Sequence, residues 1–487
     1  MKDVDLVSIS ADEWDERTFP RAEEQEFDRV VERAISRRGF LGGVLAFGSA
    51  AAAMGTGLMT GTSAQAQAAV NRFPFTPIDI ATDNDIHVPE GYNWKVLVRW
   101  GDPLFEGVDG AFDHETGGAT EASDKVFGEN TDGVESFVYE GRQLLVINHE
   151  YTNRDVNLPH TEEGAPGGAE DVLKLQNLQG ISVIEVAEGP DGWRVVANSP
   201  YNRRLTHNSP MQIVGPAAGH DLLKTDADPT GTRSLGTMNN CGSGKTPWGT
   251  YLTCEENFNG YFGSTEERQD QKPAATLDGY ARYGIGAEGW GYDYHKWDPR
   301  FDTSVNPNEP HRVGWVVEID PTDPESTPVK HTGLGRFKHE NAEVVLARDG
   351  RVVVYMGDDE RGEFVYKFVS TNSYAPGGST EGLLDDGTLY VARFDDDQTG
   401  EWLPLTPETT GMELPEILIF ARKAGSAVGA TTMDRPEWIS ANPHAIEVYC
   451  CLTNNRNRGV RPNAGGDETP VNGPNPREVN HYGQIVR

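Results

Sequence analysis

From Val96 onward, the hydrophobic residues of this chain fall into short runs separated by turn residues. Runs of this length that are rich in β-branched and aromatic residues predict β-strands. The clearest are Gln143–Ile147, Ile181–Val186, Trp193–Ala197, Val313–Ile319, Arg351–Tyr355, Phe364–Val369, Thr388–Arg393, Ile417–Ala421 and Ile446–Thr453. Long helical periodicity is absent from the sequence, so the pattern predicts an all-β protein.

Two of the predicted strands are separated by a turn sequence. Asp349-Gly350 lies between Glu343–Leu346 and Arg351–Tyr355, and this dipeptide favours the tight turn of a β-hairpin. Regular strands joined by Gly-rich turns fit a sandwich, a large barrel or a propeller. The sequence shows no clean repeat, so the blades of a propeller would have to be divergent. We interpret three loop-rich stretches as insertions within one domain: Pro159–Glu170, Glu266–Trp297 and Ala375–Gly382.

The first 66 residues have the features of an export signal. Ser36–Leu41 is a twin-arginine motif, and an apolar run from Gly42 to Met59 follows it. Ala64-Gln65-Ala66 then offers a small-residue cleavage site. The alternative is a membrane anchor, which the short, Gly-interrupted run disfavours. We therefore expect residues 1–66 to be a twin-arginine signal peptide with a long acidic leader, recognised by the twin-arginine export machinery. The mature protein would be periplasmic or extracellular, without a stable membrane anchor.

Charge narrows the range of partners. The 487 residues include 76 Asp and Glu against 42 Lys and Arg, which gives a formal net charge of −34. Such a surface repels nucleic acid and anionic membranes and favours cations. An anionic substrate such as a phosphate would need bound cations to reverse the local field. The four cysteines, two of them adjacent, do not form a disulfide framework.

The segment Asn239–Asn257 carries the strongest chemical signal. It places Cys241 in a Gly-rich turn and ends a strand-like run in Glu255 and Glu256. A soft thiolate together with hard carboxylates can hold a transition metal and calcium in one site. The alternatives are a buried, inert thiol and two solvated charges. Adjacent residues on a strand face opposite sides, so the chain would have to bend at the strand end to aim both glutamates at one site.

The same segment contains Gly244-Lys245-Thr246, which resembles the end of a phosphate-binding loop. That motif needs Gly at position 239, where Asn239 stands, and a helix after Thr246, where Pro247 follows instead. A nucleotide-binding loop is therefore disfavoured.

Four further polar clusters lie at predicted strand ends or turns: Asn148–Tyr151, Arg336–Glu343, Gly357–Arg361 and Asp434–Trp438. Glu340 could bind a metal, with His339 or Asn341 in support. Arg435 could bind a phosphate through two hydrogen bonds. The alternative for Arg435 is a local ion pair with Asp434 or Glu437. Strand ends gather at the mouth of a propeller or barrel, so these clusters are predicted to share one site.

Motifs along nearly the whole mature chain then carry a family resemblance. They are Val88–Tyr92, Arg99–Leu104, Asn148–Asn153, Ser199–Arg204, Gly215–His220, Cys241–Phe262, Arg336–Glu340, Gly357–Asp359, Asp434–Trp438 and Tyr482–Ile485. In these motifs the chain resembles the PhoX family of secreted alkaline phosphatases.

The resemblance implies a six-bladed β-propeller over residues 67–487 that holds iron and calcium joined by an oxo bridge. It implies that Arg435 and Glu437 are catalytic, and that the metal ligands are Cys241, Glu255, Glu256, Glu340 and Glu437. The expected activity of this monomer is hydrolysis of phosphate monoesters, with some diesters. Chains of the family continue past the position of Arg487 with another strand-rich segment and a further acidic ligand. We therefore expect a propeller that is incomplete at its C-terminus.

Two other functions remain as alternatives. One is a calcium-dependent propeller lactonase or esterase, and the other is a non-enzymatic secreted propeller that binds calcium. Neither requires a thiolate, so the segment around Cys241 argues against both.

Overall fold

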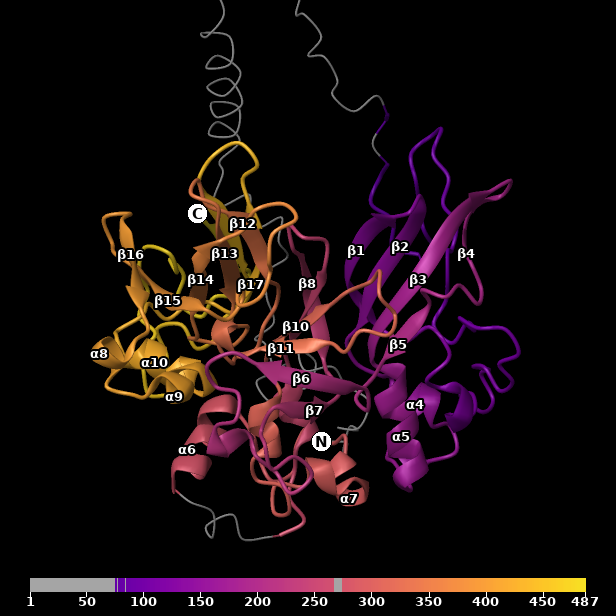
Figure 1. Ribbon diagram of the computed structural model, residues 1–487, viewed down its shortest axis with the longest axis horizontal. Coiled ribbons are helices and arrows are strands. Elements are labelled where there is room, and N and C mark those ends of the chain that lie inside the picture. Colours follow the sequence, from indigo (N-terminus) through magenta and orange to yellow (C-terminus); the bar gives the residue numbers. More distant parts are fainter. Residues whose placement is uncertain (1–74, 77, 84, 267–273) are drawn as a thin grey trace, which may run out of the picture. The chain divides into compact units, whose positions relative to one another are not determined.

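The computed structural model describes residues 75–76, 78–83, 85–266 and 274–487 (Figure 1). The chain divides into a unit that contains Asp12–Val96 and a unit that contains Leu97–Arg487. In the first unit the described residues form no helix or strand. The predicted export signal lies outside the described residues. Within the described ranges, no helix has the length and apolar character needed to cross a membrane.

The second unit consists mainly of antiparallel sheets (Figure 1). The first sheet has the order β1-β2-β3-β4, with β5 paired to β3. Its strands are β1 (Thr131–Tyr139), β2 (Arg142–His149), β3 (Gly180–Gly189), β4 (Gly192–Val195) and β5 (Arg203–Leu205). The second sheet has the order β7-β6-β11-β10-β9-β8, in which only the pair β6–β11 is parallel. Its strands are β6 (Pro210–Val214), β7 (Arg233–Leu235), β8 (Asn240–Lys245), β9 (Tyr251–Glu255), β10 (Val316–Ile319) and β11 (Val329–His331).

The third sheet is a meander in which each strand pairs with the next along the chain. Its strands are β12 (Glu343–Leu346), β13 (Arg351–Gly357), β14 (Val365–Ser373), β15 (Gly387–Phe394) and β16 (Gly400–Pro404). The fourth sheet contains β17 (Pro436–Ala441), β18 (Val448–Leu452) and β19 (Gln484–Val486). The prediction of an all-β protein is confirmed. The described residues form four sheets, and the count of six blades stays a prediction.

Helices are short and lie in the connections between strands. They are α4 (Arg154–Asn157), α5 (Ala169–Leu178), α6 (Ala274–Tyr283), α7 (Tyr294–Trp297), α8 (Pro407–Thr410), α9 (Leu414–Ile419) and α10 (Ala421–Ala427). Single 3₁₀ turns cover Thr120–Ala122, Glu162–Gly164, Asp221–Leu223, Phe258–Tyr261, Pro299–Phe301, Glu309–Arg312 and Thr332–Leu334. The stretch Glu266–Trp297, interpreted as an insertion, therefore carries helices, because α6 and α7 lie within it.

The predicted hairpin is confirmed. Glu343 pairs with Tyr355 and Leu346 pairs with Val352, and Gly350 takes the left-handed conformation that the turn requires, with φ of 83°. Every run predicted as a strand overlaps an observed strand except Ile417–Ala421, which belongs to α9 and α10. Its residues are almost completely buried. A short, continuous apolar run looks the same in a buried helix as in a buried strand, and here the helix is the correct assignment.

One edge strand of each sheet meets the edge strands of its neighbours. β8 contacts β1 and β12, and β12 also contacts β17. Glycines make the approach possible: a Cβ atom on Gly242 would lie 1.9 Å from the carbonyl oxygen of Glu340, and one on Gly244 would lie 2.1 Å from that of Ala342. The polar clusters found in the sequence therefore converge along this row of edge strands.

Candidate metal centre

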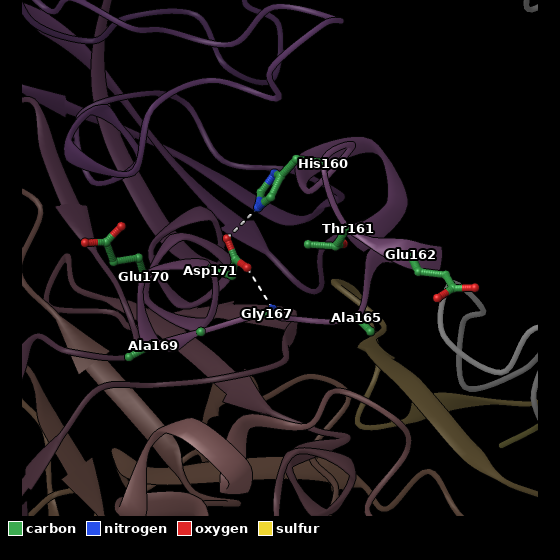
Figure 2. Close-up of a pocket in the computed structure, with 9 residues that line it drawn as sticks. His160, Thr161, Glu162, Ala165, Gly167, Ala169, Glu170 and Asp171 are labelled. Carbon is green, nitrogen blue, oxygen red and sulfur yellow. Dashed lines mark hydrogen bonds and ion pairs between the residues drawn. The ribbon is translucent and has the colours of Figure 1, made fainter.

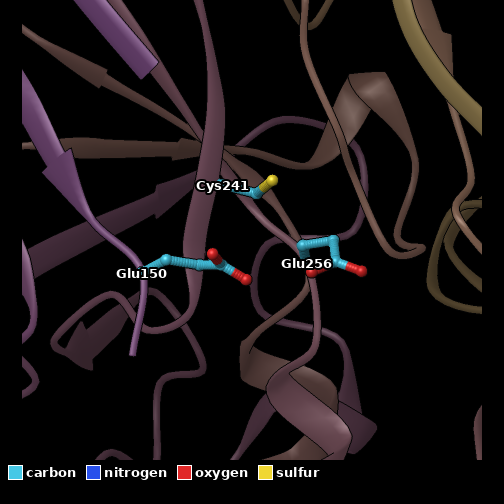
Figure 3. A group of neighbouring side chains, drawn as sticks. All are labelled: Glu150, Cys241 and Glu256. Carbon is cyan, nitrogen blue, oxygen red and sulfur yellow. The ribbon is translucent and has the colours of Figure 1, made fainter. Parts of the chain in front are cut away.

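Two groups of potential metal ligands lie in the described part of the chain. Glu150, Cys241 and Glu256 form the first, and Glu256, Glu340 and Asp359 form the second. Within each group the ligand atoms lie within 4.8 Å of one another. Glu256 belongs to both, so the five residues form one continuous set, which we call the acidic cluster. Figure 3 shows the first group, whose side chains come from three separate segments of the chain.

The main chain at Cys241 is tightly held. The pairing of β8 with β9 shifts its register beside Cys241, and such a bulge re-aims the side chain. Asn148, at the end of β2, donates to the carbonyl oxygens of Cys241 and Gly242 at 2.7 and 2.9 Å. The amide oxygen of Asn148 accepts from the hydroxyls of Tyr251 and Thr253, each at 2.9 Å. β2 and β9 together therefore position the cysteine.

The Cys241 thiol faces carboxylates. Its Sγ atom lies 3.3 Å from Oε2 of Glu340 and 3.5 Å from Oδ2 of Asp132, and the residue is 7% exposed. Burial raises the pKa of Cys241 well above its usual range, and the charges of Glu340, Glu150 and other carboxylates raise it further. A thiolate can form here only where a cation offsets this negative surrounding.

The carboxylates of the acidic cluster, like the Cys241 thiol, are in an environment that disfavours their charged forms. Glu256 is 2% exposed, and its Oε1 atom is buried without a hydrogen-bond partner among the described residues. Burial raises the pKa of Glu256 well above the usual value, and Asp359 and Glu150 add to the effect. Burial also raises the pKa of Glu340, followed by the charges of Glu437 and Glu256. Bound cations would remove both penalties, so the donor set fits a metal centre.

Glu255 lies outside this cluster, although the family resemblance implies that both adjacent glutamates bind metal. Its Oε1 atom pairs with Nζ of Lys330 at 2.8 Å, and both side chains are fully buried. Its Oε2 atom accepts from the backbone N–H groups of Gly314 and Trp315 at 2.9 and 3.0 Å. The physical reason is that neighbouring residues at a strand end still point to opposite sides. Glu256 faces the acidic cluster, and Glu255 faces β11.

Arg435 lies beside the acidic cluster at the start of β17, in the left-handed conformation with φ of 49°. Its Nε and Nη2 atoms donate to the two carboxylate oxygens of Asp359 at 2.8 and 2.7 Å. Nη2 is also 3.8 Å from Oε1 of Glu437. Asp434, considered as a local partner of Arg435, pairs instead with Arg458 at 2.6 Å. Asp359 therefore holds the guanidinium next to the potential metal ligands.

Comparison with known proteins places this geometry in a family. The sequence matches the family described as alkaline phosphatase PhoX over residues 73–487. The chain belongs to the PhoX alkaline phosphatase family. Among solved structures it is similar to Pseudomonas fluorescens PhoX in complex with vanadate, a transition state analogue, with 50% sequence identity and a TM-score of 0.78. The match covers 84% of this chain and 72% of that chain. A search of curated proteins gave no match.

PhoX membership confirms the resemblance seen in the sequence and the expected function. The chain is a phosphatase that hydrolyses phosphate esters, and its sheets form a β-propeller-like fold. PhoX enzymes are metal-dependent, and the acidic cluster provides residues that could hold a metal. The lactonase and the non-enzymatic propeller considered above are therefore disfavoured.

Two members of the PhoX acidic cluster, Glu150 and Asp359, occur in polar motifs noted in the sequence but were not named as ligands. The signal was present, because Glu150 directly follows β2 and Asp359 lies two residues after the end of β13. Asp132 was missed altogether. It lies in an ordinary Thr-Asp-Gly sequence at the start of β1, and only packing brings it to Cys241.

Lys338 is a second residue that the sequence did not assign. Its Nζ atom donates to Oε2 of Glu360 at 2.9 Å and lies 5.4 Å from the centroid of the Trp290 ring. Its charge opposes the effect of burial on the pKa of Glu256, so it lies close enough to influence the acidic cluster. Together with Arg435 it provides positive charge beside the carboxylates.

Of the two residues expected to support Glu340, the structure favours Asn341. Its side chain accepts from the N–H of Ile439 at 2.8 Å and donates to the carbonyl oxygen of the same residue at 2.9 Å. This exchange ties the segment before β12 to β17. His339 instead stacks on Phe337 with centroids 3.7 Å apart, and burial lowers its pKa to about 3. It acts as a neutral core residue.

An open hollow of about 700 Å³ at the start of α5 shares no residue with the acidic cluster. His160 pairs there with Asp171 at 3.0 Å, and Asp171 also accepts from the N–H of Gly167 at 2.8 Å (Figure 2). Glu162 and Glu170 point away from this pair (Figure 2). The hollow therefore lacks a converging set of ligands and is not part of the candidate site.

Proposed function

We propose that this PhoX phosphatase holds iron and calcium in the acidic cluster and hydrolyses phosphate monoesters, with some diesters, beside it. One observation carries the proposal: one thiol and four carboxylates share a buried cluster, and a buried oxygen of Glu256 has no partner within the described residues. Removing a charged group from water costs on the order of several kcal/mol per ion, and neighbouring like charges add to this cost unless cations offset it. Resident metals would remove that cost.

The donor types indicate which metals fit. The soft sulfur of Cys241 suits a transition metal such as iron, and carboxylate oxygens suit calcium. Glu150, Glu256, Glu340 and Asp359 would supply these oxygens. Glu437 would be a further ligand, as the family resemblance implies, and it lies close enough for its charge to contribute to the raised pKa of Glu340. When bound, the metals supply positive charge that attracts a phosphate and stabilises negative charge as the ester bond breaks.

Residues of the chain would orient the substrate. Arg435 is the proposed phosphate-binding side chain, and Asp359 holds its guanidinium in place through two hydrogen bonds. A guanidinium stays protonated and matches the geometry of phosphate oxygens. Lys338 would add positive charge on the side of Glu256. Cys241 would act as a ligand and not as a nucleophile, since burial and neighbouring carboxylates disfavour its thiolate without a cation.

The vanadate complex of the 50% identical Pseudomonas fluorescens PhoX supports a site for phosphoryl transfer in this chain too. We further infer that the protein is exported through its twin-arginine motif, Ser36–Leu41, and acts as a monomer in the periplasm or outside the cell. PhoX enzymes are secreted, which agrees with this inference.

Exchange of Cys241 for Ser tests the metal centre. We expect the Cys241→Ser variant to lose iron. Loss of a residue that only supports a metal ligand typically lowers activity by about 10–100-fold, so the kcat/KM of this variant for p-nitrophenyl phosphate should fall by at least that much. Iron and calcium are measured by elemental analysis of the purified protein. Cys254→Ala is the matched control, because Cys254 is also a buried thiol but lies in β9 outside the acidic cluster. Unchanged iron content and activity in Cys241→Ser would show that the ligand assignment is wrong.

A further inference from the structure

We propose that Asn239 is a positioning residue that holds Glu150, Cys241 and Glu256 together. The inference rests on the metal centre proposed above and adds to it the residue that keeps three of its ligands in place. Asn239 directly precedes β8, is 3% exposed, and has φ of 47°. Asparagine tolerates this left-handed conformation better than most residues.

Every hydrogen-bonding group of the Asn239 side chain is used. Its Oδ1 atom accepts from the N–H of Asn257 at 2.7 Å. The backbone carbonyl oxygen of Asn239 also accepts from the N–H of Glu256, at 3.0 Å. Its Nδ2 atom donates to the hydroxyl of Tyr261 at 3.2 Å and to the carbonyl oxygen of Glu150 at 3.5 Å. A backbone N–H can only donate, so Oδ1 must face Asn257, which settles the orientation of the amide.

These contacts connect three strand ends. Glu150 follows β2, Cys241 lies in β8, and Glu256 follows β9. Asn239 bonds directly to the main chain of the first and the last and lies two residues before the second. It is the junction at which the segments of the first ligand group meet.

A buried network anchors the amide from behind. The hydroxyl of Tyr261 donates to Oε1 of Gln179 at 2.8 Å, and Nε2 of Gln179 donates to the hydroxyl of Tyr294 at 3.1 Å. Tyr261 also stacks on Tyr292, with ring centroids 4.4 Å apart. The network extends from the start of β8 to α7, so it fixes the position of the Asn239 side chain.

The chemistry explains why an amide suits this position. The carboxylates of Glu150 and Glu256 and the thiol of Cys241 place their ligand atoms within 4.8 Å of one another, so a further negative charge at this junction would increase the repulsion between them. A neutral amide joins the main chains that carry these groups and adds no charge to the cluster. Residues that orient metal ligands in this way typically affect metal affinity by about 10–100-fold.

The test uses Asn239→Gly, with Asn240→Gly as the matched control. Glycine accepts the positive φ and keeps the carbonyl contact to Glu256, so the exchange removes only the amide contacts. Asn240 is the adjacent buried asparagine, and its side chain donates to the hydroxyls of Thr237 and Thr253, at 2.7 and 2.9 Å. Both variants introduce one glycine at the N-terminal end of β8.

Metal-free full-length protein is titrated with Co²⁺ and followed by thiolate-to-cobalt charge-transfer absorption. Loss of this absorption in Cys241→Ser verifies that it reports on Cys241. We expect the apparent Kd for Co²⁺ to rise about 10–100-fold in Asn239→Gly and to change less than about threefold in Asn240→Gly. Thermal unfolding of the metal-free proteins shows whether both variants remain folded.

Equal Co²⁺ affinity in Asn239→Gly and the unmodified protein would overturn the inference. Equal weakening in both variants would also overturn it, because general loosening of β8 would then be the cause. If Asn239→Gly does not fold, Tyr261→Phe decides: it removes the hydroxyl that holds the amide, and an unchanged Kd would refute the role. Absence of the absorption band in the unmodified protein would contradict the metal centre itself, and with it the inference.

Discussion

Glu255 and Glu256 are neighbours in the chain with opposite electrostatic environments. Glu255 forms a fully buried ion pair with Lys330, and both of its oxygens have partners. Glu256 lies among other carboxylates, and its Oε1 atom has no hydrogen-bond partner in the part of the chain that the structure describes. The first carboxylate therefore contributes to folding, whereas the second is available for a cation.

Replacing each glutamate by Gln should separate the two roles. We expect Glu255→Gln to lower the free energy of unfolding by about 3–5 kcal/mol, because Lys330 would be left as an uncompensated buried charge. Its metal content should stay unchanged. Glu256→Gln should leave the metal-free protein as stable or more stable, because it neutralises a buried carboxylate that lies among other carboxylates, and should reduce metal content. Urea unfolding of metal-free protein and elemental analysis measure both quantities.

The two variants control for each other, because each makes the same chemical change at adjacent positions. Loss of metal in Glu255→Gln with full retention in Glu256→Gln would show that the assignments are reversed.

At the scale of elements, His331 links β11 to β10 and to the loop before β15. Its Nδ1 atom pairs with Oδ2 of Asp385 at 2.7 Å, and its Nε2 atom pairs with Oε2 of Glu318 at 3.0 Å. Burial opposes protonation, but the two carboxylates outweigh it and raise the pKa of His331 to about 10. The protonated His331 therefore connects two strands and a loop through ion pairs with Glu318 and Asp385.

This link predicts a loss of stability at alkaline pH. An unfolded histidine has a pKa near 6.5, so the contribution of His331 is complete below that pH and disappears as the pH rises through about 10. At about 1.4 kcal/mol per pKa unit, the contribution is a few kcal/mol. The free energy of unfolding of the unmodified protein should exceed that of His331→Gln most at pH 6 and progressively less toward pH 10.

Urea unfolding across this pH range measures the difference. His160→Gln is the control, because His160 is a largely exposed residue paired with a single carboxylate. A difference between the unmodified protein and His331→Gln that does not change with pH would contradict the account.

At the scale of the whole molecule, the formal net charge of −34 makes self-repulsion a general feature. The acidic cluster adds to this repulsion locally, since it gathers four carboxylates, three of them buried. Bound cations and dissolved salt would both relieve this repulsion, the former at the cluster and the latter over the surface.

The metal-free protein should therefore be stabilised by salt. We expect its unfolding temperature to rise by several degrees between about 10 mM and about 0.5 M NaCl, because the Debye length shortens from about 30 Å to a few ångströms. Calcium added at constant ionic strength should raise it further through the acidic cluster. The same measurement in sucrose solutions of matched osmolarity controls for general effects of solutes. An unfolding temperature that stays level or falls with NaCl would contradict the prediction.

The sequence alone determined many of the strands, the family and part of the candidate site. The hairpin Glu343–Leu346 with Arg351–Tyr355 could be predicted because its apolar pattern and its turn residues are local properties. Cys241 and Glu256 could be proposed because a thiol in a polar, Gly-rich turn and a carboxylate at a strand end are visible in one short segment.

Only the tertiary structure decided the rest. The run Ile417–Ala421 is helical although its composition suits a strand, because burial imposes the same apolar pattern on both. Glu255 points away from the acidic cluster toward Lys330, which is 75 residues away in the chain. Asp132 reaches Cys241 across 109 residues, and no local pattern records such a contact. Local sequence determines which elements form, whereas the packing of edge strands from different sheets determines which side chains meet.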